Sequence, residues 1–193
     1  VKKPAPAVSA LMRELATYIA HAARNPLPKP VIEKTKHHVL DTLAAMVSGS
    51  RLLPGMRAIS YVNTLGGVKE ACVVGSGLVT SAENAALANG MLAHADETDD
   101  SHAPSLTHPG CGIVPAALAM AERGRCCGAA LLRAMVLGYD VCARISHALG
   151  VERFRSAGHS THSFGGTFGA AAAAGALAGL NSDQVRYLLS YTA

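Results

Sequence analysis

Large aromatic side chains are scarce in this sequence, which has no tryptophan and in which Phe, Trp and Tyr together make up 4% of the 193 residues. Half of the residues are nevertheless hydrophobic, so the core has to be built from Ala, Leu, Val and Met. Small core residues allow helices to approach one another closely. The length suffices for one domain with a sizeable core. The composition therefore predicts an all-α, alanine-rich helical domain over residues 1–193.

Runs of like charge are also missing. The net charge is +4, and the lysines and arginines are scattered without interleaved aromatic residues. This pattern argues against a nucleic-acid partner. The longest uncharged run, residues 156–182, is rich in alanine and glycine, and it is too weakly apolar for a membrane span. We expect this run to be a buried helix and the protein to have no membrane association.

The five cysteines are an odd number, and no two of them have the C-x-x-C spacing. This argues against a disulfide framework or a zinc knuckle, and for a reducing compartment. Residues 1–6 lack the apolar core of a signal peptide. We therefore expect a cytoplasmic protein.

Hydrophobic periodicity and capping signals predict helices along most of the chain. The expected helices cover residues 8–24, 30–49, 54–65, 80–96, 112–123, 128–149 and 165–180, and a last one follows a capping box at Asn181 and Gln184. Residues 71–75 are β-like but short. Residues 150–162 are expected to form a loop.

Residues 89–109 have the densest set of titratable side chains in the sequence. Four are acidic and three are histidines: Asp96, Glu97, Asp99, Asp100, His94, His102 and His108. These groups can move protons near neutral pH. A polar loop between two apolar, alanine-rich segments is a candidate functional site. The alternative is a solvated acidic loop whose histidines have no role.

Other polar residues receive simpler interpretations. We predict no ligand role for His37 or His38, which lie on the second expected helix. Asp140 and Arg144 are four residues apart and are expected to pair on a helix surface. Cys126 and Cys127 are expected to be packed thiols, because no histidine lies near them in sequence.

Four stretches, taken in order, resemble the MmgE/PrpD family. Residues 36–43, followed by Gly49, are similar to the family's Lys-x-x-x-Leu-Asp-Thr-Leu segment. Residues 88–110 are similar to its Asn-Gly, His-Ala-Leu-Asp-Phe-Asp-Asp-Thr and His-Pro elements. Residues 138–144 are similar to its Gly-Tyr-Glu and Arg, and residues 166–180 to its Gly-Thr segment with the following alanines.

The resemblance implies a larger helical domain followed by a smaller α/β domain, of which only the helical part is present here. It implies a homodimer that needs no metal or iron–sulfur cofactor. The family includes 2-methylcitrate dehydratases, cis-aconitate decarboxylases and an iminodisuccinate epimerase. A cofactor-independent lyase acting on a small di- or tricarboxylate is therefore expected, with an epimerase as the alternative. The family's site lysines and a tyrosine lie beyond residue 193.

The resemblance also implies roles for individual residues. His108 is expected to transfer a proton, with Asp99 or Glu97 orienting it, and His162 or His159 is expected to be the second proton carrier. Ser101 retains the hydroxyl of the family's threonine. The candidates for substrate binding are Asp96, His102 and Arg155.

Two other classes of function stay open. A metal-dependent enzyme could use His94, Asp99, His102 and His108, since these side chains suit Zn, Mn or Fe. Their spacing matches no known metal signature, however. The chain could also be a helical scaffold or an inactive fragment, because fold alone does not imply function.

Overall fold

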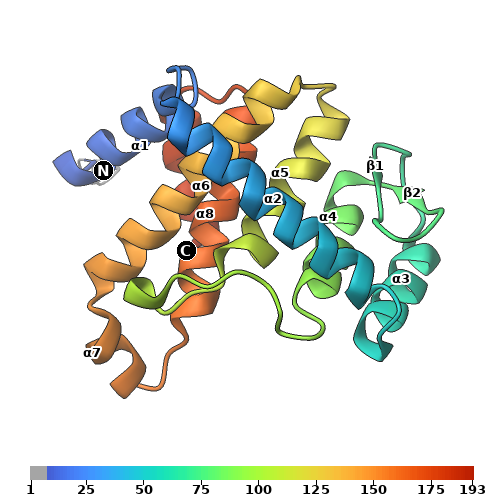
Figure 1. Cartoon of the computed structure of the whole chain (residues 1–193). Helices are drawn as coiled ribbons and strands as arrows, with labels where there is room; N and C mark the ends of the chain where they lie inside the picture. Colours follow the sequence, from blue (N-terminus) through green and yellow to red (C-terminus); the bar gives the residue numbers. More distant parts are fainter. Residues whose placement is uncertain (1–7) are drawn as a thin grey trace, which may run out of the picture.

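The computed structural model describes residues 8–193. Nearly all regular structure in this part of the chain is helical, and the elements follow one another as shown in Figure 1. The α-helices are α1 (Ala10–Ala22), α2 (Lys29–Gly49), α3 (Leu53–Leu65), α4 (Ala82–Ala93), α5 (Pro109–Arg123), α6 (Gly128–Leu149), α7 (Val151–Ser156), α8 (Thr161–Leu177) and α9 (Ser182–Thr192). The prediction of an all-α, alanine-rich domain is confirmed.

Three short elements complete the fold. Strands β1 (Ala71–Cys72) and β2 (Val79–Thr80) pair antiparallel, with Ala71 opposite Thr80. The 3₁₀ helix η1 (Ala103–Ser105) lies in the loop between α4 and α5. Among the described residues no helix combines the length and the apolar character that crossing a bilayer requires.

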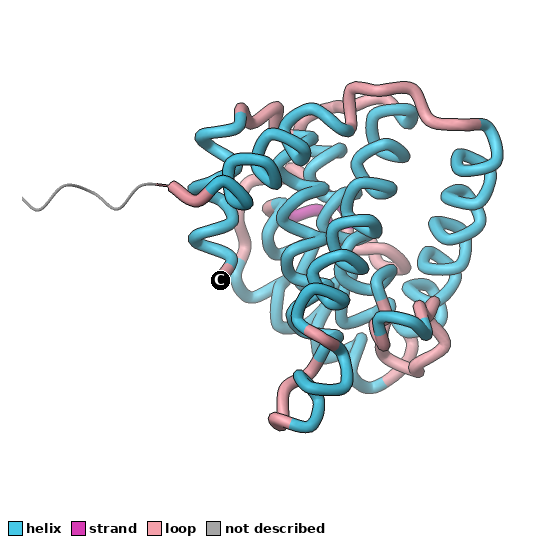
Figure 2. Tube along the Cα trace, turned by 90° about the vertical axis from the view of Figure 1, so that its left-hand side faces the viewer, coloured by secondary structure: helices cyan, strands magenta, loops and turns pink. Residues whose placement is uncertain are grey.

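Helix α8 lies at the centre, packed most extensively against α6 and α5, while α2 crosses α4 and α5 on one side. The view in Figure 2 shows the same bundle from the side, with α7 and its loop projecting at one end. Ala172 and Ala173 of α8 are fully buried. The prediction that this small-residue helix forms part of the core is therefore confirmed.

Two glycines let α6 and α8 come together. A Cβ atom added to Gly169 would lie 2.6 Å from the carbonyl oxygen of Gly138, and one added to Gly138 would lie 2.9 Å from that of Gly169. Contacts this short cannot be accommodated without moving a backbone. The sequence places glycine at both positions because any side chain there would push the helices apart.

The core has two parts. The larger cluster is enclosed by α2, α4, α5, α6 and α8, with Met46, Leu92, Ile113 and Met135 among its fully buried side chains. The smaller cluster joins α1 and α9 to α6 and α8. With Ile and Met as its largest members, the core is built from the small apolar residues that the composition predicts.

Two expectations about local structure are wrong. Residues 150–162 are not all loop, because α7 forms directly after Gly150, whose φ of 73° ends α6. Helix α8 begins at Thr161, four residues earlier than expected. Both errors lie in a polar, glycine-rich segment, where hydrophobic periodicity gives no signal.

Candidate functional site

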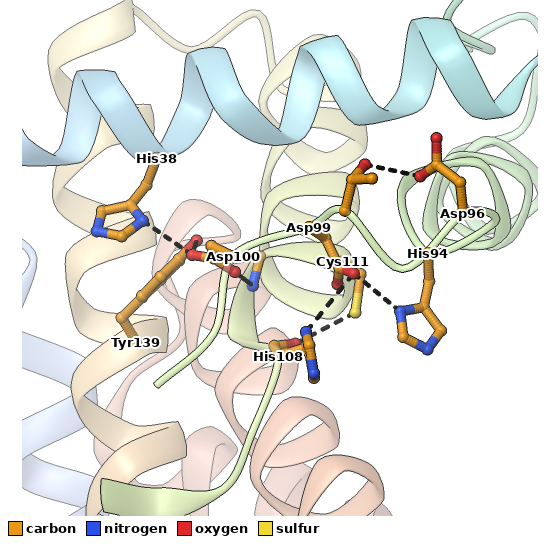
Figure 3. A network of polar contacts seen from close by, with 10 residues as sticks. His38, His94, Asp96, Asp99, Asp100, His108, Cys111 and Tyr139 are labelled. Atoms are coloured by element: carbon orange, nitrogen blue, oxygen red, sulfur yellow. Dashed lines mark hydrogen bonds and ion pairs between the residues drawn. The ribbon is translucent and has the colours of Figure 1, made fainter. Parts of the chain in front are cut away.

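The carboxylate of Asp99 lies at the centre of a cluster of titratable side chains (Figure 3). Its side chain is 0% exposed. Its Oδ1 atom lies 3.0 Å from Nδ1 of His94 and 3.6 Å from Nδ1 of His108. A buried carboxylate is costly unless cationic or hydrogen-bonding groups surround it. Asp99 is thus within hydrogen-bond distance of His94 and close enough to His108 for an electrostatic contact.

Local backbone structure brings these three side chains together. His94 is the C-cap residue of α4, and His108 is the N-cap residue of α5, directly before Pro109. Proline suits the first position of a helix, so α5 begins immediately after His108. The loop from α4 to α5 therefore starts and ends at a histidine and carries Asp99 between them.

His162 comes to this cluster from a different part of the chain. It lies in the first turn of α8, and its ring stacks on that of His108 with 4.9 Å between centroids and 24° between planes. His94 lies on the other side, with its ring centroid 5.6 Å from that of His108. The structure thus brings His108, His162 and Asp99 together from separate segments of the chain.

A cavity of about 540 Å³ opens beside the three histidines. Small-molecule sites commonly have volumes of this order. Residues of α5 and α8 complete its wall, which consists of His94, His108, Cys111, Gly112, His162, Ser163, Gly166, Thr167 and Ala170. The cavity wall thus combines three imidazole groups with small residues, two of which carry hydroxyl groups.

The surroundings shift the pKa values of two groups at this cavity. Burial, followed by the neighbouring charges of His108 and His94, lowers the pKa of His162, and Arg155 adds to this decrease. Burial and the nearby Asp99 carboxylate raise the pKa of the Cys111 thiol to about 12. His162 is therefore a neutral proton acceptor at neutral pH, whereas Cys111 stays protonated.

Asp100 belongs to a second polar network. Its Oδ2 atom lies 2.9 Å from Nδ1 of His38 and accepts a hydrogen bond of 2.8 Å from the Tyr139 hydroxyl. Its Oδ1 atom accepts a hydrogen bond of 2.7 Å from the backbone N–H of Gly110. Asp100 therefore braces the loop by tying it to α2, α5 and α6.

His38 takes part in this network through a contact that the sequence does not indicate. His38 has an acidic partner, but that partner lies 62 residues further along the chain, at Asp100. A search limited to one helical turn could not find it. His37 is exposed, as expected of a residue without a role.

The remaining acidic candidates lie outside the histidine cluster. Glu97 is exposed and has a φ of 55°. Asp96 accepts hydrogen bonds from Ser48, at 2.9 Å, and Thr98, at 2.7 Å, and these bonds lower its pKa. Of the two carboxylates considered as partners of His108, Asp99 is the one in contact with it.

Three other predicted site residues do not line the cavity beside His108. Ser101 and His102 line a separate cavity of about 190 Å³ next to Asp100. His102 Nδ1 lies 2.6 Å from the hydroxyl oxygen of the buried Ser105, so the metal-ligand set that included His102 is not assembled. His159 stacks on Phe154, with centroids 4.8 Å apart, and does not line the histidine-lined cavity. The structure thus places His162, not His159, beside His108.

Cys111 also belongs to the cluster, although the sequence did not predict it as a site residue. Its thiol lies beside His94 and Asp99, and one potential ligand atom from each of the three residues falls within 4.8 Å of the other two. The thiol donates a hydrogen bond of 3.2 Å to the carbonyl oxygen of His108. The signal that could have found it is its position three residues after His108, which is one helical turn.

The arrangement as a whole is suited to proton transfer. Two stacked imidazoles lie beside one cavity, and the Oδ1 atom of a buried carboxylate lies 3.6 Å from Nδ1 of one of them. General acid–base catalysis needs a donor and an acceptor within reach of the same substrate. His108 and His162 satisfy that geometric requirement.

Comparisons with known proteins agree with the family resemblance. Residues 13–193 match the family model described as the MmgE/PrpD N-terminal domain. The cis-aconitate decarboxylase-like protein of Aspergillus oryzae is 28% identical over 179 residues, which are 89% of this chain and 37% of that protein. The cis-aconitate decarboxylase of Aspergillus terreus is 26% identical over 185 residues, or 93% of this chain and 38% of that protein.

The present chain therefore spans well under half the length of these relatives. The family match, by contrast, covers nearly all of it and includes α4, α5, α8 and the histidine cluster that they carry. On this evidence the chain belongs to the MmgE/PrpD family, of which it represents the N-terminal domain.

Proposed function

We propose that the full-length protein is a cofactor-independent lyase that acts on a small di- or tricarboxylate, and that decarboxylation of cis-aconitate is the first reaction to test. The stacking of His162 on His108, next to the buried Asp99, carries this proposal. The names of the two relatives favour decarboxylation over dehydration.

Both reactions of this class depend on moving protons. Decarboxylation breaks a carbon–carboxylate bond, releases CO₂ and leaves an electron pair delocalised over the allylic carbons, where a proton must then be added. Dehydration removes a proton from carbon and needs an acid to protonate the departing hydroxyl group. A pair of histidines that can hold one proton between them serves either reaction.

Each residue of the cluster has a proposed task. His108 donates the proton to the substrate carbon, and Asp99, whose Oδ1 atom lies 3.6 Å from His108 Nδ1, keeps that ring beside the cavity. His162, with its lowered pKa, accepts and returns protons as the neutral partner. Arg155 and the hydroxyls of Ser163 and Thr167 are proposed to bind substrate carboxylates, the latter two from the cavity wall.

The test is an assay of the full-length protein with a panel of polycarboxylates. Purified protein is incubated with cis-aconitate, 2-methylcitrate and citrate, and the products are identified by NMR together with released CO₂. Conversion of cis-aconitate to methylenesuccinate supports a decarboxylase, and water loss from 2-methylcitrate supports a dehydratase. Inversion of a stereocentre without loss of mass supports an epimerase. No turnover of any of these substrates contradicts the lyase proposal.

We also propose a homodimer, on the family resemblance alone. Light scattering on the full-length protein gives its mass in solution directly. A monomeric mass at micromolar concentration contradicts this part of the proposal.

A further inference from the structure

Asp99 and three neighbouring side chains, two imidazoles and a thiol, form a cluster of potential metal ligands. Potential ligand atoms of His94, Asp99 and Cys111 all lie within 4.8 Å of one another. His108 is the next candidate ligand: its Nδ1 atom lies 3.6 Å from Asp99 Oδ1, although it does not belong to the group of three whose ligand atoms are all mutually close. Figure 3 shows these side chains converging from α4, the loop and α5 on one small volume. Imidazole, thiolate and carboxylate are the side chains that bind zinc in proteins.

Two of the polar atoms in this volume are buried without a partner. Asp99 Oδ2 and His108 Nδ1 have no hydrogen-bond partner among the described residues. A buried polar atom without a partner is destabilising, and such atoms in a native protein point to a ligand or ion that satisfies them. Both atoms belong to residues that face the same point.

We propose that His94, Asp99, Cys111 and His108 form a binding site for a soft divalent cation, with Zn²⁺ as the best match. Tetrahedral zinc requires its ligand atoms to be about 3.3–3.7 Å apart, given metal–ligand distances of about 2.0–2.3 Å. His94 Nδ1 and Asp99 Oδ1 are 3.0 Å apart, and the largest separation among the three clustered ligands is below 4.8 Å. These three ligands thus lie near the spacing that tetrahedral zinc requires, and His108, in contact with Asp99, is the candidate for the fourth position.

The site also has an entry path. The side chain of His94 is 48% exposed, whereas that of Asp99 is 0% exposed. An ion can therefore reach the exposed imidazole first and then move inward to the carboxylate. When Cys111 coordinates the ion as a thiolate, its proton passes to solvent.

Binding of a cation at this site should also affect catalysis, and this part of the inference rests on the proposed function. A cation held by His108 and Asp99 occupies the lone pair of the proton donor and the carboxylate that orients it. The site therefore inhibits the lyase reversibly, since the cation and the reactive protonation state of His108 exclude each other.

The direct test uses Co²⁺ as a spectroscopic probe on the full-length protein after chelator treatment. Cobalt bound to a thiolate gives a charge-transfer band in the near ultraviolet, and we expect this band to saturate at one Co²⁺ per chain and to disappear when Zn²⁺ is added. Cys111→Ser should abolish the band, and the matched control Cys127→Ser, at an exposed thiol, should keep it. Absence of the band in the unaltered protein overturns the inference, as does its persistence in a folded Cys111→Ser variant.

A second variant keeps the test valid should Cys111→Ser fail to fold. His94 is half exposed, so His94→Gln should fold normally and weaken Zn²⁺ binding by at least about tenfold in calorimetry. His37→Gln is the control and should bind Zn²⁺ as the unaltered protein does. Equal affinity in all three proteins overturns the site. Zinc binding without lyase activity contradicts only the proposed function, and lyase activity without zinc binding contradicts only this inference.

Discussion

Asp99 and Asp100 are adjacent in the chain, but their carboxylates belong to two separate networks. Asp99 lies 3.0 Å from His94 and beside the cavity, whereas Asp100 lies 2.9 Å from His38 on α2. In an extended segment successive side chains point in opposite directions. One loop can thus carry a candidate catalytic carboxylate and, in the next residue, the carboxylate that fixes the loop to the bundle.

We expect Asp100→Asn to lower stability. Asp100 accepts hydrogen bonds from Tyr139 and the Gly110 backbone and pairs with His38. Loss of charge-assisted bonds to a buried carboxylate should reduce the free energy of unfolding by about 1–3 kcal/mol, measured by urea denaturation. Asp96→Asn is the control and should change it by less than about 0.5 kcal/mol. Equal free energies of unfolding for the two variants would show that the Asp100 contacts do not stabilise the fold.

A matched pair of glycines on α8 tests the close contact with α6. Gly169→Ala places a methyl group 2.6 Å from the Gly138 carbonyl oxygen and should lower stability by about 1–3 kcal/mol. Gly166→Ala meets no atom within 4 Å, and the better helix propensity of alanine should raise stability by up to about 1 kcal/mol. Thermal unfolding that shifts in the same direction for both variants would contradict the packing described here.

The sequence predicts most of the fold because its helices carry clear periodicity and caps. The capping box of Asn181 and Gln184 is present, and α6 has the predicted bounds of residues 128–149. The titratable loop was identified by its composition. What the sequence could not provide were contacts between segments far apart in the chain, such as that between His38 and Asp100. The choice between His159 and His162 likewise depended on α7, which shows no hydrophobic periodicity.

The pKa of His162 should be observable by NMR. Burial and the positive charges of His108 and His94 hold it below the ordinary value of 6.5. In His108→Gln the His162 pKa should rise toward that value without reaching it, because burial, the largest cause, remains. Titration of the histidine Cε1–H signals measures both values. An unchanged His162 pKa in this variant would mean that the two rings do not interact.

The same shift predicts how stability depends on pH. Between the lowered pKa of folded His162 and 6.5, the unfolded chain binds more protons than the folded one. The free energy of unfolding should therefore fall as pH decreases through that interval. Above pH 6.5, where His162 is mostly neutral in both states, this residue should cause no further change in stability. His162→Gln should flatten this part of the profile, whereas His37→Gln should leave it unchanged. Denaturant melts at several pH values provide the comparison.

Two cysteines should differ strongly in reactivity toward iodoacetamide. Burial and Asp99 raise the pKa of Cys111 to about 12, whereas the backbone N–H groups at the start of α6 lower that of the exposed Cys127. Because the thiolate is the nucleophile, Cys127 should be alkylated first at pH 8 and Cys111 much more slowly. Peptide mass spectrometry over time measures both rates. Faster labelling of Cys111 would contradict the burial of its thiol beside a carboxylate.

Replacing His108 tests the proposed proton donor itself. The Nδ1 atom of His108 has no hydrogen-bond partner within the described part of the chain, and the bond from Cys111 goes to the backbone carbonyl of His108. His108→Gln therefore removes the titratable ring while leaving these backbone contacts in place, so the unfolding midpoint should hardly change. If His108 transfers the proton, kcat of the full-length enzyme should fall about 10²-fold or more, in line with general acid–base contributions. His37→Gln, at an exposed position on α2, is the control and should retain full activity. A His108→Gln enzyme with normal kcat would remove His108 from the chemistry and leave His162 and Asp99 to be examined as its replacements.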